Sequence, residues 1–75
     1  MSLGSVICVD TKRVHRFSRW DGPATVAAAL TAWGEHWDNL TVKHSDIPTR
    51  DGTFYGYKAL DRKRLLARVI VHHPR

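Results

Sequence analysis

The sequence predicts an α+β fold in which a single helix packs on one face of a mainly antiparallel sheet of four or five strands, in the order ββαβββ (or βαβββ). Three observations carry this prediction. Two runs of apolar, aromatic and β-branched residues flank the charged segment 61–64, which is typical of a β-hairpin. The alanine-rich segment 24–32 has the one strong helical pattern in the chain. Short alternating segments bounded by turn residues account for the other strands.

The N-terminal part predicts a β-hairpin. Residues 5–10 and 14–20 are expected to form two strands, and the turn between them places Lys12 and Arg13 at the tip. The alternative is one long bent strand over 7–20, and the hairpin is preferred.

The helix is expected to begin at Pro23, with Asp21 or Gly22 as its cap, and to end at Gly34 unless a last turn continues to Trp37. One apolar stripe has the i, i+4, i+7, i+11 spacing of a helix face and consists of Val26, Leu30, Trp33 and Trp37. The tryptophans, including the one before the helix, are expected to pack between helix and sheet rather than to form a ligand cage.

Residues 40–47 predict a further strand, with Leu40, Val42 and His44 on one face. The segment 48–52 contains Pro and an Asp-Gly pair, which predict a turn before the final hairpin.

In the final hairpin, Leu60 is expected to pair with Leu65. One face is then mostly apolar and suited to the core, and it consists of Phe54, Gly56, Lys58, Leu60, Leu65, Ala67, Val69 and Val71. The other face carries Tyr55, Tyr57, Ala59, Leu66, Arg68 and Ile70, with Tyr57 opposite Arg68 and Tyr55 opposite Ile70. A shift of one residue in register exchanges the two faces.

The composition is that of a small basic protein. The 75 residues include 12 Lys and Arg against 7 Asp and Glu, for a formal net charge of +5. They are expected to form one domain, 1–75, and residues 1–4 are interpreted as an expression-derived or disordered extension.

The lone cysteine, Cys8, favours a reducing, cytoplasmic setting. No membrane span or signal peptide is recognised, so no membrane partner is expected.

The excess of positive charge favours an acidic partner such as nucleic acid, RNA or DNA. This hypothesis assigns binding to cations near the hairpin tips and to an aromatic and cationic sheet face: Arg13, Arg16, Tyr55, Tyr57, Arg62, Lys63, Arg64 and Arg68. Cations meet phosphates, tyrosine rings stack on single-stranded bases, and a basic hairpin can enter a groove as a β-ribbon. The simpler alternative is a solvated charge cluster that protects the sheet edges.

A second hypothesis is a protein-protein interaction or homo-oligomerisation module. One helix cannot cover both faces of such a sheet, so the uncovered face, with Tyr55, Leu66 and Ile70, is expected to be buried against a second copy or another protein. The two hypotheses are compatible, because a dimer places two basic tips together.

The sequence predicts neither an enzyme nor a metal protein. Cys8 has no acidic or histidine neighbour at catalytic spacing, and His44 with Asp46 lacks an accompanying nucleophile. There is no glycine-rich phosphate loop. The histidines are scattered without zinc spacing, so no metal, cofactor or small-molecule substrate is expected.

Overall fold

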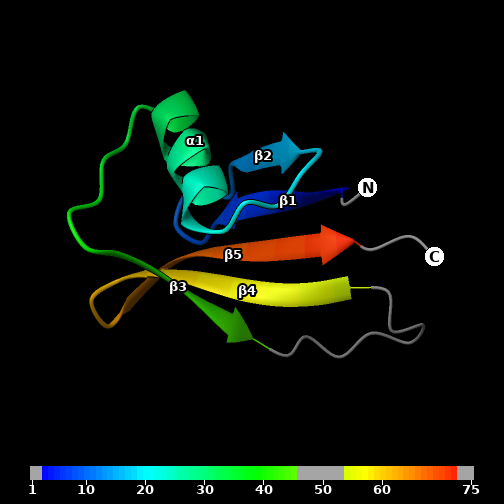
Figure 1. The fold of residues 1–75 in the computed structure, drawn as a ribbon. Helices are drawn as coiled ribbons and strands as arrows, with labels where there is room; N and C mark the ends of the chain where they lie inside the picture. Colours follow the sequence, from blue (N-terminus) through cyan, green and yellow to red (C-terminus); the bar gives the residue numbers. More distant parts are fainter. Residues whose placement is uncertain (1–2, 46–53, 73–75) are drawn as a thin grey trace.

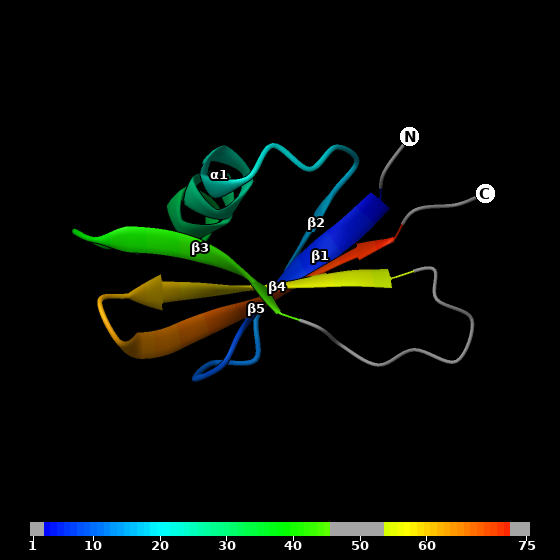
Figure 2. The ribbon, with the colours of Figure 1, turned by 60° about the horizontal axis from the view of Figure 1, so that its bottom comes forward.

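The computed structural model of the chain describes residues 3–45 and 54–72 (Figure 1). Within these residues the elements follow in the order β1 (Leu3–Cys8), β2 (Val14–Phe17), α1 (Pro23–Trp33), β3 (Leu40–Ser45), β4 (Phe54–Asp61) and β5 (Arg64–His72). The strands form one antiparallel sheet with the spatial order β2-β1-β5-β4-β3. Helix α1 connects the two edge strands and packs on one side of the sheet (Figures 1 and 2). The predicted α+β architecture ββαβββ is confirmed.

The N-terminal hairpin is confirmed, and the single bent strand is wrong. In its turn, the Cys8 N–H donates to the Arg13 carbonyl (2.9 Å) and the Lys12 N–H donates to the Cys8 carbonyl (3.0 Å). Strand β1 begins at Leu3, so residues 3 and 4 belong to the sheet. Gly4, with Val71 on one side and Phe17 on the other, pairs in both ladders of β1.

Helix α1 has the ends that the sequence indicates. Gly22 is the N-cap, and Pro23 is the first helical residue, where its missing N–H removes no helical hydrogen bond. The hydroxyl oxygen of the buried Thr25 accepts a hydrogen bond from the Asp21 N–H (2.8 Å), which fixes the position of the chain just before the helix. At the other end, Gly34 adopts a left-handed conformation (φ 73°), which glycine accepts at little cost, and α1 ends at Trp33.

The core lies between α1 and the sheet and is built from small aliphatic side chains. Its buried members are Val6, Val26, Ala29, Leu30, Ala59, Ala67, Val69 and Val71. Half-buried aromatic side chains close the edges of this cluster: Phe17, Trp20, Trp33, Trp37 and Tyr57. The prediction that the tryptophans pack between helix and sheet is therefore confirmed, although Trp37 lies in the loop after α1.

A β-bulge between β4 and β5 sets the register of the C-terminal hairpin. Leu60 pairs with Leu65 as predicted, but Ala59 pairs with Ala67, which leaves Leu66 as an extra residue in β5. A bulge of this kind opposes two residues of one strand to a single residue of its partner. Every pairing beyond it is therefore displaced by one residue from the predicted register.

The displacement overturns the predicted face of β4. Tyr57 is opposite Val69 rather than Arg68, and Tyr55 is opposite Val71 rather than Ile70. Lys58, which the prediction placed toward the core, is opposite Arg68. On β5 the prediction is correct for Ala67, Val69 and Val71, which are buried, and wrong for Leu65, which is half-buried and outside the core cluster.

Some predictions lie outside the described residues. They are the turn at 48–52, the last two residues of the strand predicted over 40–47, and His73. Among the described residues, α1 is too short to cross a membrane.

The β4–β5 turn contains a strained residue whose replacement is expected to stabilise the fold. Arg62 has φ 58°, in the left-handed region that costs an ordinary residue about 1 kcal/mol. Arg62→Gly is expected to raise the free energy of unfolding by about 0.5–1 kcal/mol, measured by urea denaturation. Lys63→Gly is the matched control and is expected to destabilise, because Lys63 has an ordinary negative φ. Equal effects of the two substitutions would show that the positive φ of Arg62 carries no strain.

Candidate functional site

The face of the sheet opposite α1, called the open face, is covered by no described element (Figure 2). Register and burial identify its side chains, because they alternate with the buried residues of the core. They include Ser5, Ile7, Val14, Arg16, Lys43, Lys58, Arg68 and Ile70. The face is thus part aliphatic and part cationic.

Three cations occupy neighbouring positions on the open face and are called the cation row. Arg68 of β5 is directly opposite Lys58 of β4, which is directly opposite Lys43 of β3. Opposed residues on antiparallel strands have their Cα atoms about 4.5–5.5 Å apart. Like charges at such positions destabilise a sheet. Arg68 and Lys43 are exposed and Lys58 is half-buried, so the repulsion is only partly screened by solvent.

No described acid offsets this charge on the open face. Asp61 is the one acidic residue in the described strands, and it pairs with Leu40, which packs against the core on the helix side. The ion pairs found in the described part of the chain join Arg19 to Asp21 and Arg64 to Asp10, and His36 contacts Asp38; all lie outside the row. Arg16 of β2, which is exposed and opposite Ser5, adds a fourth cation to this face. The open face is therefore suited to an anionic partner.

An aliphatic area adjoins the row toward the β2 edge. Ile7 is directly opposite Arg68 on one side and Val14 on the other. Ile7 and Ile70 are half-buried, and Val14 is 54% exposed. The open face therefore presents apolar surface beside its positive charge.

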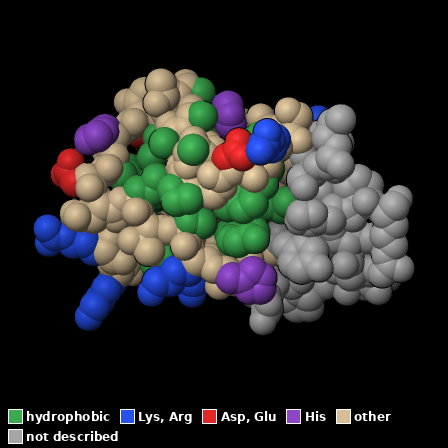
Figure 3. All heavy atoms as spheres, in the orientation of Figure 1, with side chains coloured by type: hydrophobic (Ala, Val, Ile, Leu, Met, Phe, Trp, Pro, Cys, Tyr) green, Lys and Arg blue, Asp and Glu red, His purple; other side chains and the backbone are tan. Residues whose placement is uncertain are grey.

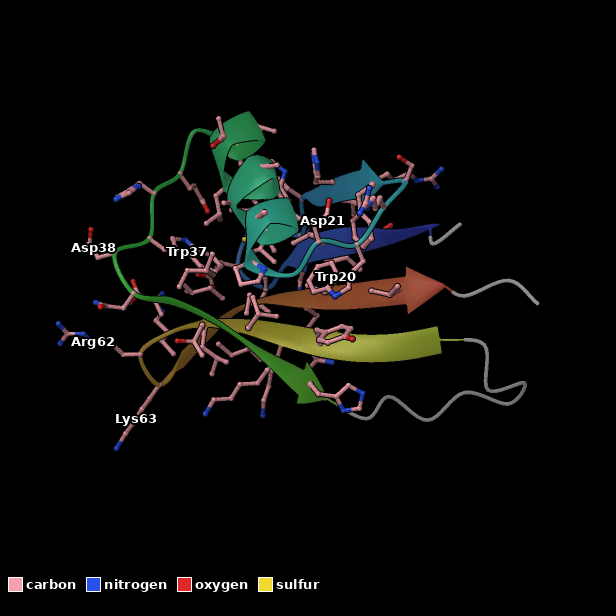
Figure 4. The ribbon with its side chains drawn as sticks, in the orientation of Figure 1. Trp20, Asp21, Trp37, Asp38, Arg62 and Lys63 are labelled. Carbon is pink, nitrogen blue, oxygen red and sulfur yellow. The ribbon has the colours of Figure 1, made fainter. Side chains whose placement is uncertain are left out.

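The two hairpin turns lie at one end of the sheet and are less strongly cationic than predicted. Arg62 and Lys63 are exposed and point away from the body of the protein (Figure 4). Arg64 is paired with Asp10 of the other turn, with Nη2 3.4 Å from Oδ2. Arg13 donates from Nη1 to the Trp33 carbonyl at the end of α1 (3.1 Å). Arg13 and Arg64 thus already have partners within the protein.

The aromatic side chains that the structure describes lie on the helix side of the sheet. In Figure 3, hydrophobic side chains gather between α1 and strands β4 and β3, and Figure 4 shows Trp20 beneath α1. The Trp20 ring centre is 4.8 Å from that of Tyr57 and 5.6 Å from that of Phe17. His44 meets Tyr57 edge-on at 5.5 Å. Tyr57 therefore does not share a face with Arg68, contrary to the prediction.

The residues predicted for a protein interface are not brought together either. Ile70 lies on the open face, whereas Leu66, the extra residue of the bulge, lines a shallow hollow with Cys8 and Trp37. For Tyr55 the structure establishes only the strand position opposite Val71. Of the predicted site, the open face retains Arg16, Arg68 and Ile70.

Sequence reasoning missed Lys43 and Lys58 as members of a cationic surface. One signal was present, because a lysine is almost never buried in a core without a partner. The predicted register placed Lys58 there and put Tyr57 outside. An arrangement of β4 with Tyr57 inside and Lys58 outside avoids burying the lysine. The bulge allows this arrangement while Ala67, Val69 and Val71 of β5 remain buried.

Comparison of the chain with protein-family models, with curated proteins and with solved structures gives no match. Within residues 3–45 and 54–72, no three His, Cys, Asp or Glu side chains converge as metal ligands would. The charges and the shape of the open face are therefore the properties that indicate what it can bind.

The cation row is expected to destabilise the protein in the absence of a partner. Lys58→Glu converts two repulsive cross-strand pairs into attractive ones and is expected to raise the free energy of unfolding by about 1 kcal/mol at low ionic strength. The gain should shrink at high salt. Lys12→Glu, the same charge change in the β1–β2 turn, is the control and should change stability by less than about 0.5 kcal/mol. A Lys58→Glu protein that is less stable than the parent at both ionic strengths would contradict the repulsion.

Proposed function

We propose that the chain is a small, non-catalytic module that binds nucleic acid through the open face of its sheet. The observation that carries the proposal is the cation row, in which Lys43, Lys58 and Arg68 occupy directly opposed positions with no acid beside them among the described residues. Arg16 on the same face, and Arg62 and Lys63 at the turn, extend the positive surface.

A nucleic acid fits this surface better than a single small anion. Its backbone repeats a phosphate charge about every 3.4 Å along each strand, so one ligand can neutralise several cations at once. The net charge of +5 favours the same partner, because it attracts polyanions from a distance. Binding replaces the repulsion within the row by attraction, which supports a ligand that spans all three strands.

Protein association is a second candidate, favoured by a different observation. Val14 is 54% exposed and lies directly opposite Ile7, and Ile70 lies diagonally across from Ile7 on the same face. Exposed apolar patches commonly mark interfaces. A second copy packed face to face would have to accommodate the cation row as well, so this candidate favours an acidic partner protein over self-association.

The proposal is tested by the salt dependence of binding. The protein is titrated into a fluorescently labelled DNA oligonucleotide at salt concentrations from about 50 to 200 mM. Four phosphate contacts predict that the logarithm of the binding constant falls with the logarithm of salt concentration with a slope of about −3 to −4. Lys58→Glu should weaken binding by roughly tenfold or more, and Lys12→Glu should have a much smaller effect. Absence of binding at about 50 mM salt, or an equal loss of affinity in the Lys58→Glu and Lys12→Glu proteins, would refute the proposed site.

Light scattering coupled to size exclusion separates the two candidates. Nucleic-acid binding predicts a larger mass with the oligonucleotide, which high salt abolishes. A dimer that persists at high salt, ignores the oligonucleotide and dissociates on Ile70→Asp would favour association through the aliphatic area.

A further inference from the structure

We infer that the open face contacts the phosphate backbone and not the bases, so that it binds duplex nucleic acid without sequence preference and more tightly than single strands. The inference rests on the proposed function and names the class of nucleic acid that the site accepts. It follows from where the fold places its rings, its helix and its cations.

The aromatic side chains that the structure describes are on the wrong side of the sheet to stack on bases held by the cation row. Phe54 has an open-face strand position, opposite His72 and four residues along β4 from Lys58. Each aromatic side chain that the structure describes packs against the core on the helix side. Single-strand binding depends on rings interleaved with cations, because each stacked base contributes substantially to affinity. Here the Trp20–Tyr57 pair and the row lie on opposite faces of one sheet. A base bound near Arg68 therefore finds Ile7 and Lys58 as its neighbours, and no described ring.

The elements that read base edges in a duplex are also missing from the described part of this face. The major groove admits an α-helix or a two-stranded ribbon. Helix α1 lies on the other side, and its exposed residues are Pro23, Ala24, Ala27, Ala28, Thr31 and Ala32, which offer little hydrogen-bonding capacity. The hydroxyl of Thr31 already donates to the Ala27 carbonyl. The hairpin of β4 and β5 is flanked by β3 and β1 and cannot enter a groove along its length.

The remaining contacts are those between cations and phosphates. A row that runs across three strands presents charges at intervals of about 4.8 Å on a fixed surface. A duplex offers phosphates at fixed positions and twice the axial charge density of one strand. It also releases more counterions for each phosphate neutralised, about 0.9 against 0.7 for single strands. For four contacts this difference predicts roughly tenfold tighter binding of the duplex at about 50 mM salt.

The experiment compares four labelled probes by fluorescence anisotropy at about 50 mM salt. They are a short DNA duplex, each of its separated strands, and a duplex of scrambled sequence with the same composition. The two duplexes should bind with Kd values within about twofold of each other and roughly tenfold below those of the single strands. The emission of Trp20, Trp33 and Trp37 should not be quenched, because the rings lie on the far face.

The outcomes separate this inference from the proposed function. Tighter binding of a single strand, a Kd difference above about tenfold between the two duplexes, or strong tryptophan quenching overturns the inference and leaves nucleic-acid binding intact. Failure to bind any of the four probes overturns both. Polyglutamate is added as a competitor: displacement of the duplex at equal charge concentration would mean that the face recognises acidic protein, and this also overturns the inference.

Lys58→Glu and Lys12→Glu supply the matched variants. If phosphate contacts alone account for binding, Lys58→Glu should weaken the binding of the duplex and of the single strands by similar factors. Lys12→Glu should leave the ratio of the two Kd values unchanged. Preservation of single-strand affinity in the Lys58→Glu protein would show that single strands bind elsewhere, and would overturn the inference for the open face.

Discussion

The bulge at Leu66 decides which side chains of β4 meet the helix and which meet the surroundings. Side chains alternate along a strand, so one extra residue in β5 reverses the pairing of everything that follows it. With the bulge, Tyr57 and Ala59 close the core together with Val69 and Ala67. Lys58 is left on the open face beside Arg68. The aromatic packing of the helix side and the cation row of the other side are thus two results of one irregularity.

The single helix imposes the second constraint. Helix α1 connects one edge strand to the other, and its 11 residues shield only part of one face of the sheet. The buried side chains beneath it are mostly valine and alanine, and half-buried rings complete the cover at the margins. A small core leaves a thin margin of stability in a chain of 75 residues. The open face consequently has to remain compatible with water while it carries Ile7, Ile70 and Val14.

Local signals were enough to predict most of the fold. Pro23 and Gly34 bracket the helix, and charged turns separate the strands of both hairpins, because these residues act through their own backbone geometry. The site depends instead on cross-strand register, which no local pattern determined. The apolar run of β5 places Ala67 inside, as predicted, whereas the cost of burying Lys58 favours Tyr57 inside instead. A regular hairpin that begins with Leu60 opposite Leu65 cannot satisfy both. Only the three-dimensional pairing reveals the bulge that does, and with it the role of Lys43 and Lys58.

Two features of the protein lower its stability, and in each case a different residue at the same position would avoid the loss. Lys12 and Arg62, one in each hairpin turn, hold backbone conformations suited to glycine, and the three cations of the row face one another across strands. Each involves a basic side chain, and each lies on a surface that no described element covers. In a domain with little stability to spare, unfavourable charges gathered in a row support the proposal that the open face binds an anionic partner.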